Sequence, residues 1–304
     1  MNKLPQVDIL IITYNQEDYI AEAIESAINQ EYPNKKIVIA DDASTDKTPN
    51  IIKKYAEKYP NLVIPAISPN NGGITANSNY GLSFCKGDFL VHMGGDDILL
   101  ANKLTKQVEW FTHNPNAVIC GHLLYTCDEN STITGKYAIQ KKSGKGSKVW
   151  IEHGTIYGAI STMIRSSSIP EYGYDKRIKW VSDWKLYIDV LANGGEYGFI
   201  NEYLGLYRKH AGNITNIKTT MMNDAKQILD IIEVEMPQYK KSVKIARSTI
   251  IEYGYAYQYL EIGDNKNAIK WFLKSIRGNP LQYKAYIRIF QLIVLSLKNK
   301  VLHK

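Results

Sequence analysis

Cysteine is scarce in this chain of 304 residues, and its three copies, Cys85, Cys120 and Cys127, form no Cys-x-x-Cys pair. Because no even disulfide framework is present, we expect a reducing, cytoplasmic setting. No run of about eighteen apolar residues occurs, which argues against a membrane-spanning helix. The amino terminus also lacks a long apolar segment followed by small residues, so a secretory signal peptide is not expected.

Charge of one sign is missing from each end of the chain. Residues 1–110 contain 10 lysines, no arginine and 14 acidic residues, which gives a net charge of −4. Residues 265–304 contain 7 lysines, 2 arginines and no acidic residue, which gives +9. An acidic front and a basic tail predict different partners for the two ends. No recognised nucleic-acid-binding motif accompanies the basic tail, so we expect no nucleic-acid partner.

Strand and helix patterns alternate along the first part of the chain. Buried strands are predicted at 7–12, 36–40, 61–67 and 88–92, with Pro65 breaking the third. Helices are predicted between them, one capped by Asn15, a second capped by Ser44 or Thr45, and a third over 77–84. Such alternation predicts a parallel sheet with right-handed crossovers, whose ligands bind beyond the carboxyl ends of the strands.

Polar residues collect at those predicted carboxyl ends, where ITYN, ADDASTD and GGDD follow three of the strands. Adjacent carboxylates repel, and two interpretations explain Asp96 and Asp97. They could cap the next helix, which carries Leu104, Val108 and Phe111, or they could bind Mg²⁺ or Mn²⁺, which prefer carboxylate oxygens. Asp41 and Asp42 leave a similar choice between an ordinary strand-to-helix loop and a contact to a nucleotide base or ribose.

Two regions in the second half of the chain depart from the alternation of strands and helices. Residues 141–148, KKSGKGSK, are predicted to form a mobile loop, and helices replace strands beyond about residue 215. Residues 255–280 predict a helical hairpin that turns at Gly263. Its small and aromatic positions are spaced as in a tetratricopeptide repeat, namely Ala256, Gly263, Ala268, Phe272 and Pro280.

The tail, residues 284–304, carries an apolar stripe beside basic residues. The stripe consists of Ile287, Phe290, Ile293, Val294 and Leu297. One interpretation is a core helix packed on the preceding hairpin. The other is a helix lying in the plane of an anionic inner leaflet, which would place the protein at the inner face of the cell membrane.

Three spaced motifs occur in a fixed order, namely ITYN, ADDASTD and the stretch that runs from NNGGITAN to MGGDD. Together they resemble the motifs of family 2 glycosyltransferases of the GT-A fold. The resemblance is close over residues 7–111 and traceable to about residue 216. It implies an α/β fold with a Rossmann-like, mostly parallel sheet flanked by helices. The implied domains are a catalytic domain, 1–216, with a nucleotide-sugar half (1–111) and an acceptor half (112–216), and a basic helical domain, 217–304.

The resemblance also implies the site residues. The residues implied to bind the uridine diphosphate part of the donor are Thr13, Tyr14, Asn15, Asp41, Asp42, Gly73, Asp96 and Arg208. The implied ligands of a divalent metal (Mn²⁺ or Mg²⁺) are Asp97, Asp96 and His210. Asp183 matches the catalytic base. A sugar hydroxyl is a poor nucleophile, so a carboxylate must accept its proton during attack. Two positions depart from the family pattern, because Gly94 and Ser182 stand where many members have an acid.

The activity implied is metal-dependent, inverting transfer of one sugar from a UDP-sugar. The expected acceptor is a glycan, often lipid-linked, in bacterial surface polysaccharide synthesis such as O-antigen or capsule. The QxxRW motif and membrane helices of the processive synthases are absent, which implies a non-processive hexosyltransferase. The competing interpretation is a catalytically degenerate adaptor that binds protein or membrane through its helical tail, and the two departures at acidic positions are its main support.

Overall fold

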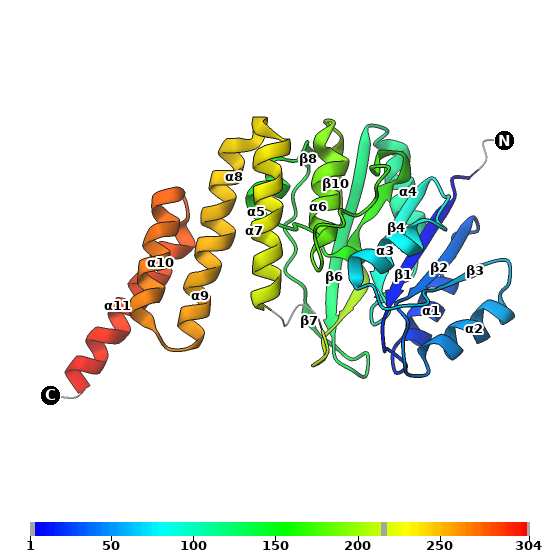
Figure 1. Ribbon diagram of the computed structural model, residues 1–304, viewed down its shortest axis with the longest axis horizontal. Helices are drawn as coiled ribbons and strands as arrows, with labels where there is room; N and C mark the ends of the chain where they lie inside the picture. Colours follow the sequence, from blue (N-terminus) through cyan, green and yellow to red (C-terminus); the bar gives the residue numbers. More distant parts are fainter. Residues whose placement is uncertain (1–3, 214–217, 303–304) are drawn as a thin grey trace. The chain divides into compact units, whose positions relative to one another are not determined.

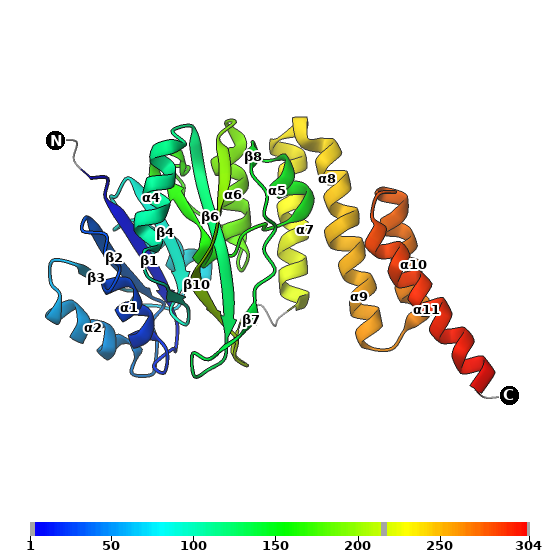
Figure 2. The same ribbon diagram turned by 180° about the vertical axis from the view of Figure 1, so that it is seen from behind.

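The computed structural model describes residues 4–213 and 218–302. The chain divides into two compact units, one formed by residues 1–147 and 155–216, the other by residues 148–154 and 217–304. The first unit mixes strands and helices, and the second consists of helices (Figures 1 and 2). We describe each unit by itself.

Ten strands form one sheet among the described residues. β3, β2, β1 and β4 are parallel neighbours, as the alternating pattern predicts. The rest of the sheet is mixed: β9 is antiparallel to both β4 and β6, β10 is parallel to β6, and β5 is antiparallel to β10. The strands are β1 (Val7–Thr13), β2 (Lys35–Asp41), β3 (Val63–Ile67), β4 (Phe89–Gly94), β5 (Ile98–Leu99), β6 (Ala117–Cys127), β7 (Ile133–Lys136), β8 (Gly144–Lys145), β9 (Met163–Arg165) and β10 (Glu196–Arg208).

Helices cover both faces of this sheet. Successive strand residues point to opposite faces, so Ile9 and Ile11 pack with α1, α2 and α4, while Leu10 and Leu90 pack on the other side with Leu82 of α3. Figure 1 shows α3 in front of the strands, and Figure 2, which is the view from the opposite side, shows α1 and α4. The helices of this unit are α1 (Ile20–Ile28), α2 (Thr48–Lys58), α3 (Ile74–Leu82), α4 (Lys103–His113) and α6 (Ser182–Ala192).

Three local predictions in this unit are wrong. Pro65 does not break β3, because β3 is the edge strand and continues through the proline opposite Ile39. Asn15 does not cap α1, which begins at Ile20; it adopts a left-handed conformation (φ 50°). Neither Ser44 nor Thr45 caps α2, which begins at Thr48, and the Thr48 N–H instead donates to Asp46 Oδ1 at 2.9 Å.

The prediction of a loop over 141–148 is also wrong in part. Gly144 and Lys145 form β8, which pairs with the start of β10, and α5 (Lys148–His153) begins within the same stretch. Pairing with a distant strand overrides the local composition of lysine, glycine and serine, which by itself favours no strand.

The second unit contains α5, α7 (Lys218–Glu235), α8 (Lys240–Ala246), α9 (Tyr253–Glu261), α10 (Asn265–Gly278) and α11 (Tyr283–Leu302). The predicted hairpin is confirmed: α9 and α10 are joined at Gly263, whose φ of 76° suits glycine, and Asp264 accepts from the Asn267 N–H. α5 is held by Glu152, which accepts from Ser242 Oγ at 2.8 Å. The resemblance to a tetratricopeptide repeat stays a prediction.

The contact of α3 with the sheet gives a test of this packing. A Cβ atom on Gly81 would lie 2.4 Å from Leu10 Cδ1 and 2.7 Å from Ala40 Cβ, so Gly81→Val should lower the free energy of unfolding by about 1–3 kcal/mol. Urea unfolding followed by circular dichroism measures this change. Gly135→Val is the control, because its nearest neighbour, Thr126 Oγ1, is 3.4 Å away. Equal stability of the two variants would contradict the packing.

Candidate functional site

The loops after β1 and β2 are held together by hydrogen bonds. The Asn15 N–H donates to Ser44 Oγ at 2.8 Å, and the Thr45 N–H donates to Asn15 Oδ1, also at 2.8 Å. The Asp42 N–H donates to Thr13 O at 3.1 Å, which joins the two loops at their base. Thr13 is buried, whereas Tyr14 projects outward with 46% of its surface exposed. The left-handed Asn15 thus shapes the carboxyl edge of the sheet, and Tyr14 is free to contact a ligand.

Asp41 and Asp42 both accept hydrogen bonds from nearby groups. Asp41 accepts from the Ser44 N–H and from Ser44 Oγ, at 3.0 and 2.5 Å, and burial raises the pKa of its carboxyl group. Asp42 accepts from the N–H groups of Gly72 and Gly73, each at 2.8 Å. Gly73 has a φ of 81°, which favours glycine. Asp42 therefore anchors the loop before α3, and its carboxylate keeps lone pairs for a further donor.

Asp96 and Asp97 lie in a turn between β4 and β5 and do not cap a helix. α4 begins at Lys103, and its N-cap residue is Asn102. The helix-capping interpretation of this pair is therefore wrong. Gly95 allows the turn to lie against β1, because a Cβ atom there would be 2.6 Å from Gln16 Oε1 and 2.9 Å from Thr13 Cβ. The pair is thus placed beside the end of β1, at the predicted edge.

The two carboxylates have different surroundings. Asp97 is 6% exposed, and its Oδ1 accepts from the Arg208 N–H at 3.1 Å. Burial and the negative charge of Asp96 raise the pKa of Asp97 well above its usual range. Asp96 Oδ2 lies 2.9 Å from His210 Nε2, and the His210 ring packs against Tyr19 with centroids 4.9 Å apart. A cation beside Asp97 would relieve the repulsion between the two acids.

Arg208 supports this turn from inside the protein. Its side chain is fully buried; Nε donates to Asp96 O at 2.7 Å, and Nη2 donates to Glu22 Oε2 at 2.5 Å. Nη1 donates to the carbonyls of Asp128 and Glu129 at 3.1 and 2.9 Å. The resemblance implied a contact between Arg208 and the nucleotide. In this structure the guanidinium holds the main chain at Asp96, and a contact between Arg208 and the nucleotide stays a prediction.

Asp183 lies in the first turn of α6. The start of α6 is tied to α3 by Thr75, whose Oγ1 donates to Ile178 O at 2.6 Å and lies 2.8 Å from Ser182 Oγ. Asp183 itself is half-buried, and desolvation raises its pKa to about 6. Tyr137 was not singled out from the sequence. Its pKa is raised by burial and then by the charges of Asp183 and Asp97, so it lies within electrostatic reach of both. No motif around Tyr137 signals this position.

The side chains of the described residues do not by themselves form a complete metal site. Among the residues that the structure describes, no three His, Cys, Asp or Glu side chains lie close enough to hold an ion. The donor set does fit the way Mg²⁺ is commonly held, by one or two carboxylates together with substrate phosphates. Asp97, together with Asp96 and its partner His210, would provide the protein ligands of the ion.

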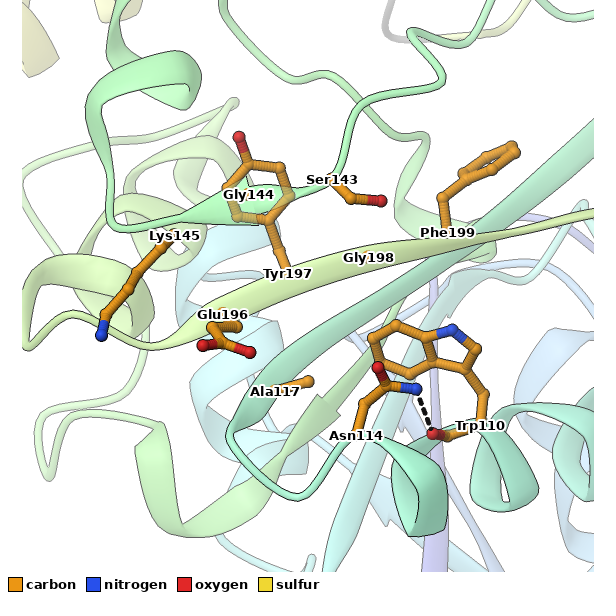
Figure 3. A pocket seen from close by; sticks show the side chains of 10 residues that line it. All are labelled: Trp110, Asn114, Ala117, Ser143, Gly144, Lys145, Glu196, Tyr197, Gly198 and Phe199. Atoms are coloured by element: carbon orange, nitrogen blue, oxygen red, sulfur yellow. Dashed lines mark hydrogen bonds between the residues drawn. The ribbon is translucent and has the colours of Figure 1, made fainter.

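A separate hollow lies at the opposite edge of the sheet. It has a volume of about 580 Å³ and opens where β6 and β10 begin (Figure 3). Trp110 lies over Gly198, where a Cβ atom would be 2.2 Å from Trp110 Cζ2. The hollow is lined by Trp110, Asn114, Ala117, Ser143, Gly144, Lys145, Glu196, Tyr197, Gly198 and Phe199. Because Asp97 and Arg208 mark the other end of these strands, this hollow does not belong to the candidate site.

Comparison with known proteins decides the family. The model of glycosyl transferase family 2 matches residues 8–172, which is more than half of the chain. The protein belongs to this family. The predicted family and the predicted α/β fold with a helical C-terminal segment are therefore confirmed, since solved structures of similar fold also exist.

The relatives vary in length and in what is known of them. Uncharacterised proteins of Mycobacterium tuberculosis and Mycobacterium bovis are 33% identical over 217 residues, 68% of this chain and 60% of theirs. The minor teichoic acid biosynthesis protein GgaB of Bacillus subtilis is 25% identical over 302 residues, 94% of this chain and 31% of its own length. The chain thus spans 60% or less of these relatives.

Two solved structures share the fold at low identity. TarS of Staphylococcus aureus, residues 1–349, in complex with UDP-GlcNAc, has a TM-score of 0.60 at 17% identity and covers 94% of this chain and 89% of its own. The mannosyltransferase of Pyrobaculum calidifontis, in complex with GDP-Man and Mn²⁺, has a TM-score of 0.66 at 15% identity. It covers 97% of this chain and 81% of its own.

The buried position of Arg208 predicts a stability effect. In Arg208→Lys the ammonium cannot reach all the acceptors of the guanidinium, and each buried carbonyl left without a donor costs about 1–3 kcal/mol. We expect a loss of this size or larger in urea unfolding. Arg247→Lys is the matched control, because Arg247 is a partly exposed residue paired with Asp230 and Glu233 and should change stability by about 0–1 kcal/mol. Equal losses in both variants would contradict the supporting role of Arg208.

Proposed function

We propose that this protein transfers one sugar from a UDP-sugar to a hydroxyl group of a glycan acceptor, with inversion at the anomeric carbon. The proposal is supported by two carboxylate systems that both lie within electrostatic reach of one tyrosine, Tyr137. Asp96 and Asp97 form one, and Asp183, whose pKa is raised to about 6, forms the other. The charges of Asp183 and Asp97 both raise the pKa of Tyr137.

The donor would lie along the edge built by β1, β2 and β4. Thr13, Tyr14, Asn15 and Asp42, with Asp41 beside them, would hold the uridine, and the backbone at Gly73 would lie close to it. Asp96 would contact the ribose. A divalent ion, Mn²⁺ or Mg²⁺, would neutralise charge on the departing diphosphate, with Asp97 as its main protein ligand and His210 beside Asp96. The complexes of the two solved neighbours, with UDP-GlcNAc and with GDP-Man and Mn²⁺, support a nucleotide-sugar donor.

Asp183 would accept the proton of the acceptor hydroxyl as the oxygen attacks. A carboxyl group with an ordinary pKa is a weak base, and desolvation makes Asp183 a stronger one while leaving it ionised above pH 6. Attack from the side opposite to the diphosphate inverts the anomeric centre. GgaB carries the name of a teichoic acid biosynthesis protein, which supports a polymer of the bacterial surface as the product. A lipid-linked acceptor at the inner face of the membrane fits that role.

The role of Asp183 is tested by Asp183→Asn. We expect turnover to fall by about 10²- to 10⁴-fold, because the amide cannot accept the proton, while UDP affinity measured by calorimetry stays unchanged. In the wild type, turnover should rise with pH through a value near 6, because the ionised form is the base. Asp88→Asn, at the exposed amino end of β4, is the control. Wild-type turnover in Asp183→Asn would assign the base elsewhere.

The roles of the acid pair are separated by Asp97→Asn and Asp96→Asn. The first should abolish the increase in UDP affinity that Mn²⁺ gives, while leaving metal-free binding in place, because it removes the charge that faces the ion. The second should weaken UDP binding both with and without Mn²⁺, because it alters the ribose contact. Calorimetric titration of UDP with and without Mn²⁺ measures both. An unchanged response to Mn²⁺ in Asp97→Asn would place the ion at other residues.

A further inference from the structure

α11 carries two separate apolar faces. The first faces the hairpin: Ala285 is fully buried, and Ile289 and Leu292 pack against the cluster of Ala256 and Phe272. This contact satisfies the interpretation of the tail as a helix packed on the preceding hairpin. It involves positions other than the predicted stripe, of which Ile287, Phe290 and Ile293 are exposed and Val294 is half-buried, while the side chain of Leu297 lies outside the described residues.

The second face, which we call the α11 stripe, is exposed. Its members are Tyr283, Tyr286, Ile287, Phe290 and Ile293, which are 63%, 49%, 50%, 68% and 48% exposed. Their spacing of three and four residues places them along one side of the helix. Single exposed apolar residues are ordinary, but an aligned row of five large side chains marks an interaction surface. Leu281, just before α11, is 86% exposed and extends the apolar surface.

The charge around the α11 stripe restricts what can cover it. Residues 265–304 contain nine lysines and arginines and no acidic residue. Lys284 and Arg288 lie exposed within α11, and Lys270 lies exposed on α10, whereas Lys274 is paired with Glu252 at 3.4 Å. A second copy packed on the same face would bring the positive charges of its Lys284 and Arg288 close to the same charges on the first copy. An anionic lipid surface would supply the opposite charge together with an apolar layer.

We propose that the α11 stripe binds an anionic lipid bilayer with α11 lying in the plane of the headgroups. No helix among the described residues is long and apolar enough to cross a membrane, which leaves in-plane binding as the mode that fits. Tyr283 and Tyr286 suit the interface, because a tyrosine ring presents an apolar body and a polar hydroxyl group. The proposal does not depend on sugar transfer, because it concerns the helical unit and is tested without donor or acceptor.

The experiment measures sedimentation of the whole chain with vesicles of phosphatidylglycerol and phosphatidylcholine, and with vesicles of phosphatidylcholine alone. We expect binding to the mixed vesicles that weakens with added salt, and much weaker binding to the neutral ones. Phe290→Glu should lower the apparent affinity about tenfold or more, because it removes a large apolar contact from the bilayer. Phe290 is 68% exposed, so the variant should retain its fold, which circular dichroism checks.

Gln291→Glu is the matched control, because it adds the same charge at the neighbouring exposed position outside the α11 stripe. It should bind mixed vesicles far better than Phe290→Glu. Equal affinities of the two variants would overturn the proposal. So would failure of the wild type to sediment with mixed vesicles, or a concentration-dependent dimer that Phe290→Glu dissociates and that binds no lipid.

Discussion

The buried guanidinium of Arg208 is the interaction on which the geometry of the candidate site depends. A buried cation must be paired, and this one joins α1 through Glu22, the segment after β6 through two carbonyls, and the acid turn through Asp96 O. The backbone N–H of the same residue donates to Asp97. One residue therefore fixes three distant segments against each other, and two like charges are held side by side at a sheet edge.

Some of the other site residues support the loops rigidly, and others keep oxygen atoms available for a ligand. The loops after β1 and β2 are tied through Asn15 and Ser44, and Asp42 anchors the loop before α3. Support of this kind keeps ligand-facing groups in place, which matters because small displacements of a reacting group reduce rate steeply. Asp183 differs from these carboxylates: within its own turn it accepts from the Trp184 N–H, and desolvation strengthens it as a base.

The sequence predicted the parallel strands and the carboxyl edge, because apolar periodicity and strand-end polarity are local signals. It did not predict the uses of Asn15, Arg208 or Tyr137, because each depends on partners many residues away. Pro65 and the β8 strand were missed for the same reason, since edge position and pairing with β10 are properties of the sheet. The two faces of α11 could not be separated by periodicity alone, because both are apolar and both have helical spacing.

The two departures at acidic positions are accommodated by the structure in different ways. A Cβ atom at residue 94 would lie 2.5 Å from Asp96 Oδ1, so the space of an additional acid is taken by the side chain that contacts His210. Ser182 lies buried beside Thr75 and helps to join α6 to α3. Asp97 and Asp183 are both present, so each proposed task keeps one carboxylate, which weakens the adaptor interpretation.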